Sequence, residues 1–242
     1  MKTWIRAPMF RYPVRKLHNI IGLVVGFQLL FWTASGLFFT IFPIEKIRGT
    51  TLRAPINHGT LALEHVQVEA SQAADLLEAR APVKSVELAM FFGEPVWKLE
   101  VGEETRMVNA QDGRVLSPIS PELAKRVAVE GMLAKAGEPA EPWLMVEDPP
   151  REYSGPLPAY VVDYEPGSVR VYIDASTGRL VTVRSNLWRT FDVLWRFHIM
   201  DITGADRFDS WWLKLFAFFG LTMVLTGAVL LVRRVRNGLI FR

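Results

Sequence analysis

Two long stretches without charge, one near each end, constrain this chain most strongly. From Leu17 to Ile44 the sequence contains no Lys, Arg, Asp or Glu, and from Trp211 to Val232 the only charged residue is Lys214. A helix rises 1.5 Å per residue, so a helix over either stretch is longer than a hydrocarbon core of about 30 Å. The sequence therefore predicts two transmembrane helices, over residues 17–43 and 211–232.

The charges at the two ends predict how these helices are oriented. Residues 1–16 and 233–242 contain no acidic residue, and together they hold nine of the 28 basic ones. The middle keeps 19 basic against 25 acidic residues, a formal charge of −6. Short segments rich in Lys and Arg stay in the cytoplasm, so both ends are expected there, with residues 44–210 on the far side. The pI of about 9.3 thus needs no nucleic-acid partner to explain it.

The region between the spans contains an internal repeat. Residues 107–116 and 172–181 share a strand, an Asn/Asp-Ala pair, a turn glycine, an arginine and a second apolar strand. Alternating strands precede them at 96–101, 160–164 and 169–173, and helical spacing occurs at 71–80 and 121–136. We therefore predict an α+β membrane protein whose far-side domain has two helix-plus-antiparallel-sheet units, residues 44–138 and 139–186. Residues 139–158 form a proline-rich connector, and the aromatic residues 187–210 form an interfacial helical segment.

The absence of cysteine leaves histidine as the strongest metal ligand in the chain. His18 begins the first span, and Gly22 and Gly26 follow on the same helical face, leaving space beside the imidazole for a flat macrocycle. His198 lies in an aromatic segment before the second span. Each has an ordinary alternative: glycines that only pack helices, or a histidine that faces water from an amphipathic helix.

Taken together, these two histidines bracket the bilayer, and ionisable groups at membrane depth are functional candidates. In a two-fold dimer each would meet its own copy, which gives two bis-imidazole sites suited to b-type haem. The partner prediction is therefore a homodimer in the lipid bilayer, with two haems per dimer. His58 and His65 lie in a polar stretch and are predicted to be surface histidines.

Several short motifs, in this order, resemble the PepSY-associated transmembrane family, which includes inner-membrane reductases of ferric iron and ferric siderophores. They are residues 15–22, Ser35-Gly36, residues 43–49, the two repeated turns, residues 196–198, Thr226-Gly227 and Arg233-Arg234. The resemblance implies that the two sheet units are PepSY-like, that the membrane is the bacterial inner membrane and that the domain is periplasmic. Its larger relatives carry four helices in one chain, which favours a dimer here. The predicted cofactor-binding set is Arg15, Lys16, His18, Gly22, Gly26, Arg196 and His198, with His18 and His198 as haem-iron ligands.

The resemblance also implies a function. The chain would be a haem-b reductase that passes electrons across the membrane to ferric iron or a ferric siderophore. Neither a Gly-x-Gly-x-x-Gly motif nor a cytoplasmic domain is visible, so a membrane quinol or a separate donor would supply the electrons. The alternative is a non-enzymatic, membrane-anchored binding or regulatory protein. The sequence identifies no catalytic residue.

Overall fold

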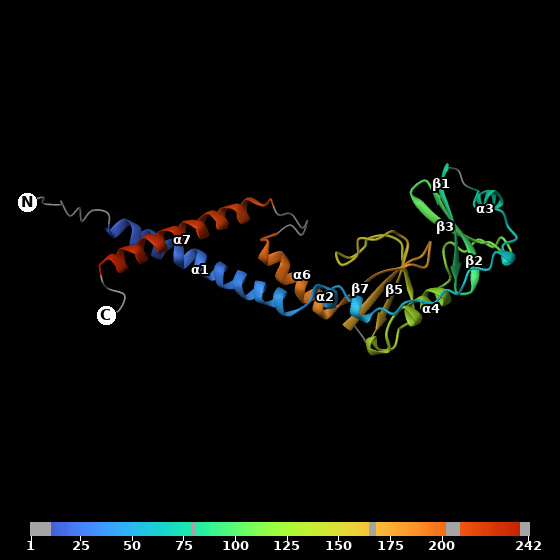
Figure 1. The fold of residues 1–242 in the computed structure, drawn as a ribbon, viewed down its shortest axis with the longest axis horizontal. Coiled ribbons are helices and arrows are strands. Elements are labelled where there is room, and N and C mark those ends of the chain that lie inside the picture. The colour runs from blue at the N-terminus through green and yellow to red at the C-terminus, as the bar shows by residue number, and fades with distance from the viewer. Residues whose placement is uncertain (1–10, 79–80, 165–167, 202–208, 238–242) are drawn as a thin grey trace, which may run out of the picture. The chain divides into compact units, whose positions relative to one another are not determined.

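The computed structural model describes residues 11–78, 81–164, 168–201 and 209–237 (Figure 1). The chain divides into two compact units, one of Met1–Pro43 with Thr190–Arg242 and the other of Ile44–Arg189. Long helices build the first unit and two antiparallel sheets build the second. The protein is thus an α+β chain with an apolar helix on each side of its sheet-containing middle.

Two long apolar helices dominate the first unit. α1 (Arg11–Ile41) ends before Pro43, which disfavours helical geometry in the residue that precedes it. α7 (Trp211–Arg236) begins at Ser210, whose hydroxyl accepts a hydrogen bond of 3.3 Å from the backbone N–H of Leu213. Both are long and apolar enough to cross a membrane, over Val14–Ile41 and Trp211–Arg236. This agrees with the two predicted spans.

The two helices run antiparallel and side by side (Figure 1). Gly22 of α1 faces Met223 of α7, whereas Leu29, further along α1, faces the earlier Gly220. Their other faces are apolar and open: Leu23 is 84% exposed and Phe27 is 77% exposed. A surface of this kind suits lipid rather than water. The C-terminal part of α6 (Asn186–His198) belongs to the same unit.

The first sheet of the second unit has the order β1-β2-β3. β1 (Val83–Phe91), β2 (Glu94–Val101) and β3 (Glu104–Asn109) are joined by tight turns and are antiparallel. The short helix α3 (Ala70–Leu76) covers one face, where Ala73, Leu77, Leu99 and Val108 form a small core.

The second sheet has the order β4-β5-β6-β7 and is also antiparallel. Its strands are β4 (Trp143–Met145), β5 (Ala159–Tyr164), β6 (Val169–Asp174) and β7 (Leu180–Ser185). α4 (Pro121–Gly131) packs on it, begins at the capping residue Ser120 and buries Ala124, Val127 and Ala128. Short helical turns complete the unit: α2 (Ile44–Ile47), η2 (Thr50–Leu52), η3 (Leu63–His65) and η4 (Ala134–Ala136).

One hydrophobic core joins the two sheets. Phe91, Val96 and Met107 of the first sheet share a buried cluster with Val171 and Ile173 of the second. Backbone bonds also cross between the halves, since the Ile119 N–H donates to the Ala175 carbonyl at 2.7 Å. The unit therefore folds as one body, and the surfaces between its sheets are fixed.

The two repeated turns have the same hydrogen bonds. The Asn109 Oδ1 accepts from the Gln111 N–H at 2.8 Å, and the Asp174 Oδ1 accepts from the Ser176 N–H at 2.9 Å. Gly113 and Gly178 have φ of 78° and 66°, a conformation that glycine adopts without strain. The predicted internal repeat is therefore present in both its sequence and its turn geometry.

The elements differ from their predicted extents in three places. After the first turn Val115 forms only an isolated bridge to Val108, because Pro118 follows closely and has no N–H to donate. The predicted helix 121–136 ends at Gly131, and within 71–80 the described helix is Ala70–Leu76, residues 79–80 lying outside the described part. β1 and β4 were not predicted, since neither has a clean alternation of apolar and polar residues.

Candidate functional site

His18 lies in the third turn of α1 and contacts α7. Its Nδ1 is 3.0 Å from the hydroxyl of Thr226. A Cβ built on Gly227 would lie 3.3 Å from the His18 Cε1, so this glycine packs directly against the ring. The imidazole is therefore held between the two apolar helices, with one nitrogen engaged.

His198 is the last residue of α6 and contacts α1. Its Nδ1 is 2.8 Å from the hydroxyl of Ser35, which is 1% exposed. Aromatic rings surround it, with centroids of Phe39, Trp32 and Trp195 at 5.4, 6.2 and 6.5 Å. The sequence predicts a place near the edge of the bilayer; the structure places the ring beside Ser35, about 9 Å of helix before the end of α1.

The hydroxyl partners define the tautomer of both histidines. The Thr226 hydroxyl donates its proton to the Thr222 carbonyl at 2.8 Å, and the Ser35 hydroxyl donates to the Phe31 carbonyl at 2.8 Å. Each hydroxyl has one proton and can then only accept from the imidazole. With the hydroxyl protons assigned to these carbonyls, the Nδ1 of each histidine carries the hydrogen and Nε2 keeps a lone pair. That is the arrangement in which a neutral imidazole binds a metal.

Three buried nitrogens of the first unit lack a hydrogen-bond acceptor within the described part of the chain: Gln28 Nε2, Trp32 Nε1 and Arg196 Nε. Arg196 also lines a cavity of about 210 Å³ beside Met200 and Asp201. A buried donor without an acceptor costs about 1–3 kcal/mol, so a bound group with acceptor oxygens would stabilise this region. Haem b carries two carboxylates as well as its iron, so donors of this kind, with an imidazole as axial ligand, match its chemistry.

The remaining predicted cofactor residues have different surroundings. Gly22 faces Met223, whereas a Cβ at Gly26 would have no atom within 4 Å. Gly26 therefore leaves open space on the outside of α1. Arg15 and Lys16 are exposed on the turn before His18. The predicted set is divided between two helices: residues 15–26 of the set lie on α1, and Arg196 and His198 lie on α6. His18 is at another level than His198, because α1 rises about 25 Å between His18 and Ser35, the partner of His198.

The other two histidines lie in the second unit. His65 is exposed, as predicted, but His58 is half-buried and its ring stacks on Phe91 at 5.5 Å. His58 therefore keeps part of its ring exposed, with one face against Phe91. Over the residues that the structure describes, no three His, Cys, Asp or Glu side chains form a group that could hold a metal ion.

Comparisons with known proteins give no relative. A scan against protein-family models, a search of curated proteins and a search of solved structures each found no match. Membership of the PepSY-associated family therefore stays a prediction.

The hydroxyl and glycine partners of the histidines were not among the predicted site residues. Ser35, Thr226 and Gly227 occur in the sequence as small residues of apolar spans, which usually mark helix packing. Their pairing with His18 and His198 joins positions 208 and 163 residues apart. The only signal in the sequence was that Ser35 and Thr226 are each followed directly by a glycine, Gly36 and Gly227.

Proposed function

We propose that this chain is a haem-b membrane reductase that delivers electrons to ferric iron or a ferric chelate on the periplasmic side. The observation that carries the proposal is the pair of histidines, His18 and His198, each with Nδ1 at hydrogen-bond distance from a hydroxyl, an arrangement that suits an imidazole whose Nε2 binds a metal. When bound, haem supplies reversible one-electron redox chemistry through its iron.

The chain's own residues position and shield the cofactor in this proposal. Thr226 and Ser35 fix the ring orientation of the two ligands and raise their basicity. Phe39, Trp32 and Trp195 surround His198 and exclude water from it. The N–H groups of Gln28, Trp32 and Arg196 offer hydrogen bonds to carboxylates.

A homodimer completes the proposed ligand sets. The two histidines of one chain are separated by about 25 Å of helix and cannot bind the same iron. Pairing each with its copy across a two-fold axis gives two bis-histidine sites at two depths. Gly26, with open space around its Cα, allows the close approach of a second helix on that face. A membrane quinol or a separate protein would donate the electrons at the cytoplasmic side.

Haem loading of histidine variants tests the proposal. His18→Ala and His198→Ala should each lower the ratio of haem to protein and remove the spectrum of a low-spin bis-histidine haem. His65→Ala is the matched control, because His65 is exposed in η3. Full haem content in both variants would contradict the proposal.

Electron delivery is tested with the same proteins. Wild-type protein reduced by dithionite, once freed of excess reductant, should return to the oxidised spectrum on addition of ferric citrate. Failure of the reduced protein to react with ferric citrate or a ferric hydroxamate would refute the reductase function and leave haem binding intact.

A further inference from the structure

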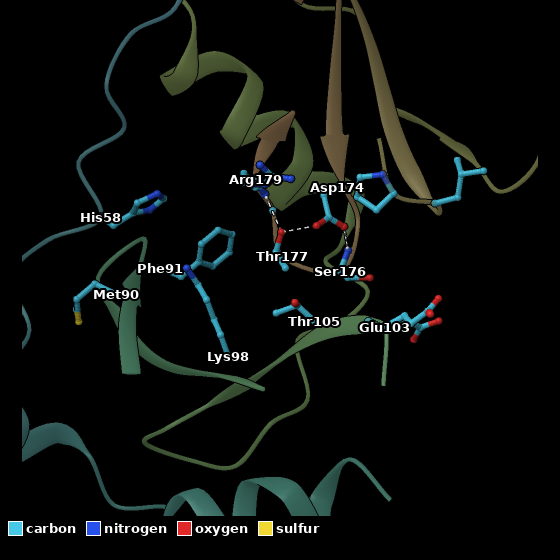
Figure 2. A pocket seen from close by; sticks show the side chains of 14 residues that line it. His58, Met90, Phe91, Lys98, Glu103, Thr105, Asp174, Ser176, Thr177 and Arg179 are labelled. Atoms are coloured by element: carbon cyan, nitrogen blue, oxygen red, sulfur yellow. Dashed lines mark hydrogen bonds between the residues drawn. The ribbon is translucent and has the colours of Figure 1, made fainter. Parts of the chain in front are cut away.

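A cleft of about 710 Å³ lies between the two sheets of the second unit (Figure 2). Phe91 and Lys98 of the first sheet and the nearby His58 lie on one side, and the β6–β7 turn with Thr177 and Arg179 lies on the other. The volume lies within the range of about 300–1,000 Å³ that is usual for small-molecule sites. Since one core joins both sheets, the walls are fixed with respect to each other.

Comparison of the two copies of the internal repeat shows that the β6–β7 turn, which lines the cleft, differs from the turn of the first copy in the partner of its arginine. In the first copy the turn arginine, Arg114, pairs with Glu94 at 3.0 Å. Asn109 and Asp174 are equivalent in the two copies, and their strand partners are Val96 and Ala159. Two residues before these partners lie Glu94 in the first copy and Leu157 in the second, so Leu157 takes the position of Glu94. Arg179, the turn arginine of the second copy, therefore has no carboxylate at the position where Glu94 neutralises Arg114. It lines the cleft instead.

Two more nitrogen donors face Arg179 across the cleft. The Nδ1 of His58 accepts a hydrogen bond from the Phe92 N–H at 3.3 Å, so the neutral ring carries its hydrogen on Nε2. Burial and then the charge of Lys98 lower the pKa of His58, while the charge of Glu130 acts in the opposite direction. His58 and Lys98 both line the cleft. Within the described residues, Lys98 and Arg179 have no ion-pair partner.

Arg53 adds positive charge behind the turn. Its guanidinium donates to the carbonyl of Val181 at 3.0 Å, and its buried Nε has no acceptor within the described residues. Burial and then Arg179 lower the pKa of Arg53, so two guanidinium groups repel one another here. An anion between the walls would relieve that repulsion.

The acidic residues of the cleft do not neutralise these groups. The Asp174 carboxylate accepts from the Ser176 N–H at 2.9 Å and from the Thr177 hydroxyl at 2.5 Å, so the turn uses both of its oxygens. Glu103 and Glu104 are exposed at the β2–β3 turn, where water screens them. The buried part of the cleft therefore favours negative charge.

We propose that this cleft binds a small organic anion, with its carboxylate held by Arg179, Lys98 and His58. Phe91 and Leu157 supply an apolar wall for the body of the ligand, which favours an organic acid over inorganic phosphate. The ligand is either a free organic acid or its ferric complex, which share this chemistry. The site does not depend on haem, so it stands or falls separately from the reductase function.

Calorimetric titration of the full chain in detergent tests this site. The probes are citrate and 2,3-dihydroxybenzoate, each alone and as its ferric complex. At least one probe should bind the wild type, and Arg179→Met and Lys98→Met should each weaken that binding at least tenfold, because each removes a charge-assisted hydrogen bond. Tighter binding of the ferric complex identifies a chelate as the ligand, and equal or weaker binding identifies the free acid.

Matched controls keep the result specific. Arg114→Met removes the equivalent arginine of the first copy, and Lys135→Met removes an exposed lysine outside the cleft. Both should bind the probe as the wild type does, and circular dichroism should show that all four variants are folded. Absence of binding by every probe, or equal weakening by the control variants, would overturn the proposal.

Discussion

At the scale of single residues, a hydroxyl lies at hydrogen-bond distance from the Nδ1 of each of two histidines, His18 and His198. Thr226 and Ser35 direct their own protons to backbone carbonyls of their helices. With their protons placed there, the two hydroxyls accept from the imidazoles, and Nε2 of each ring keeps its lone pair. The same device acts at two levels of one helix bundle, about 25 Å apart along α1.

Removing one of these hydroxyls should weaken cofactor binding without unfolding the chain. Thr226→Val nearly preserves the side-chain volume but removes the oxygen that accepts from His18 Nδ1. Loss of such an outer partner lowers affinity by about 10- to 100-fold in other metal sites, and we expect the same when haem is titrated into the variant. Thr222→Val is the control, because its hydroxyl bonds only the Phe218 carbonyl. Equal haem affinity in T226V and wild type would exclude this role for Thr226.

The position of His18 and His198 beside the two apolar helices could be predicted from the sequence, but their hydroxyl partners could not. A chain without cysteine and with four histidines leaves few metal ligands to choose from, and His18 and His198 lie beside the spans. Ser35 and Thr226 become distinguishable from other small residues only when helices distant in sequence are packed together. The absence of an ion-pair partner for Arg179 within the described residues could not be predicted either, because it becomes visible only when strand register aligns the two copies of the repeat.

At the scale of elements, the antiparallel pair α1 and α7 brings His18 against a glycine. Gly227 packs on the imidazole so closely that a Cβ added to it would lie 3.3 Å from the His18 Cε1, which is a tight contact. The helices and the repeated turns could be predicted from apolar periodicity and turn residues. β1 and β4 could not, because pairing with neighbouring strands rather than a local pattern stabilises them.

Filling the space at Gly227 should displace His18. In Gly227→Leu the Cβ alone would lie 3.3 Å from the His18 Cε1 and the larger side chain adds to this crowding, so the ring should move and the haem-to-protein ratio should fall to about half, with loss of one of the two sites. Gly36→Leu is the matched control, because no atom lies within 4 Å of a Cβ built there. Unchanged haem content in G227L would show that haem binding does not depend on the position of the His18 ring against Gly227.

A second feature at this scale is a half-buried carboxylate, Glu152, beside the second sheet. Glu152 accepts hydrogen bonds from the Arg189 Nε and the Tyr172 hydroxyl, both at 2.9 Å, and lies 3.7 Å from Arg170. Burial alone would raise the pKa of Glu152, but the hydrogen bonds from Arg189 and Tyr172 outweigh it and the pKa is lowered. The same environment raises the pKa of Tyr172 to about 12.

This carboxylate predicts a dependence of stability on pH. Because the pKa of Glu152 is lower in the folded chain, its stabilisation is complete above the unfolded value of about 4.3 and is lost as pH falls through the folded value. Glu152→Gln should lower the free energy of unfolding at pH 7 by about 1–3 kcal/mol, and its difference from wild type should shrink in acid. Thermal unfolding of the full chain in detergent measures this. Glu130→Gln is the control, with its exposed partner Arg126 on the same helix; a pH-independent effect of E152Q would contradict the assignment.

At the scale of the whole molecule, the chain has an apolar helix on each side of one sheet-containing unit. The acid-free basic ends predict that both termini are cytoplasmic. A reporter fused after Arg242 should be active only in the cytoplasm, and one inserted near Glu138 only in the periplasm. The reverse pattern would invert the direction of the proposed electron transfer.

The ligand count predicts a dimer. One chain offers a single histidine at each of two levels, and a bis-histidine haem needs two at one level. The protein in mild detergent should therefore have the mass of a dimer and carry about one haem per chain. A haem-loaded species that is strictly monomeric would exclude the shared sites.

The absorption spectrum of the purified protein tests the central claim most directly. The full chain, produced in cells supplied with haem and purified in detergent, is recorded oxidised and after dithionite. We predict a Soret band that moves to longer wavelength on reduction, together with the sharp visible bands of a low-spin b-type haem, both lost in the His18→Ala, His198→Ala double variant. A colourless protein that stays colourless when haem is added would contradict the account and favour a membrane-anchored binding protein.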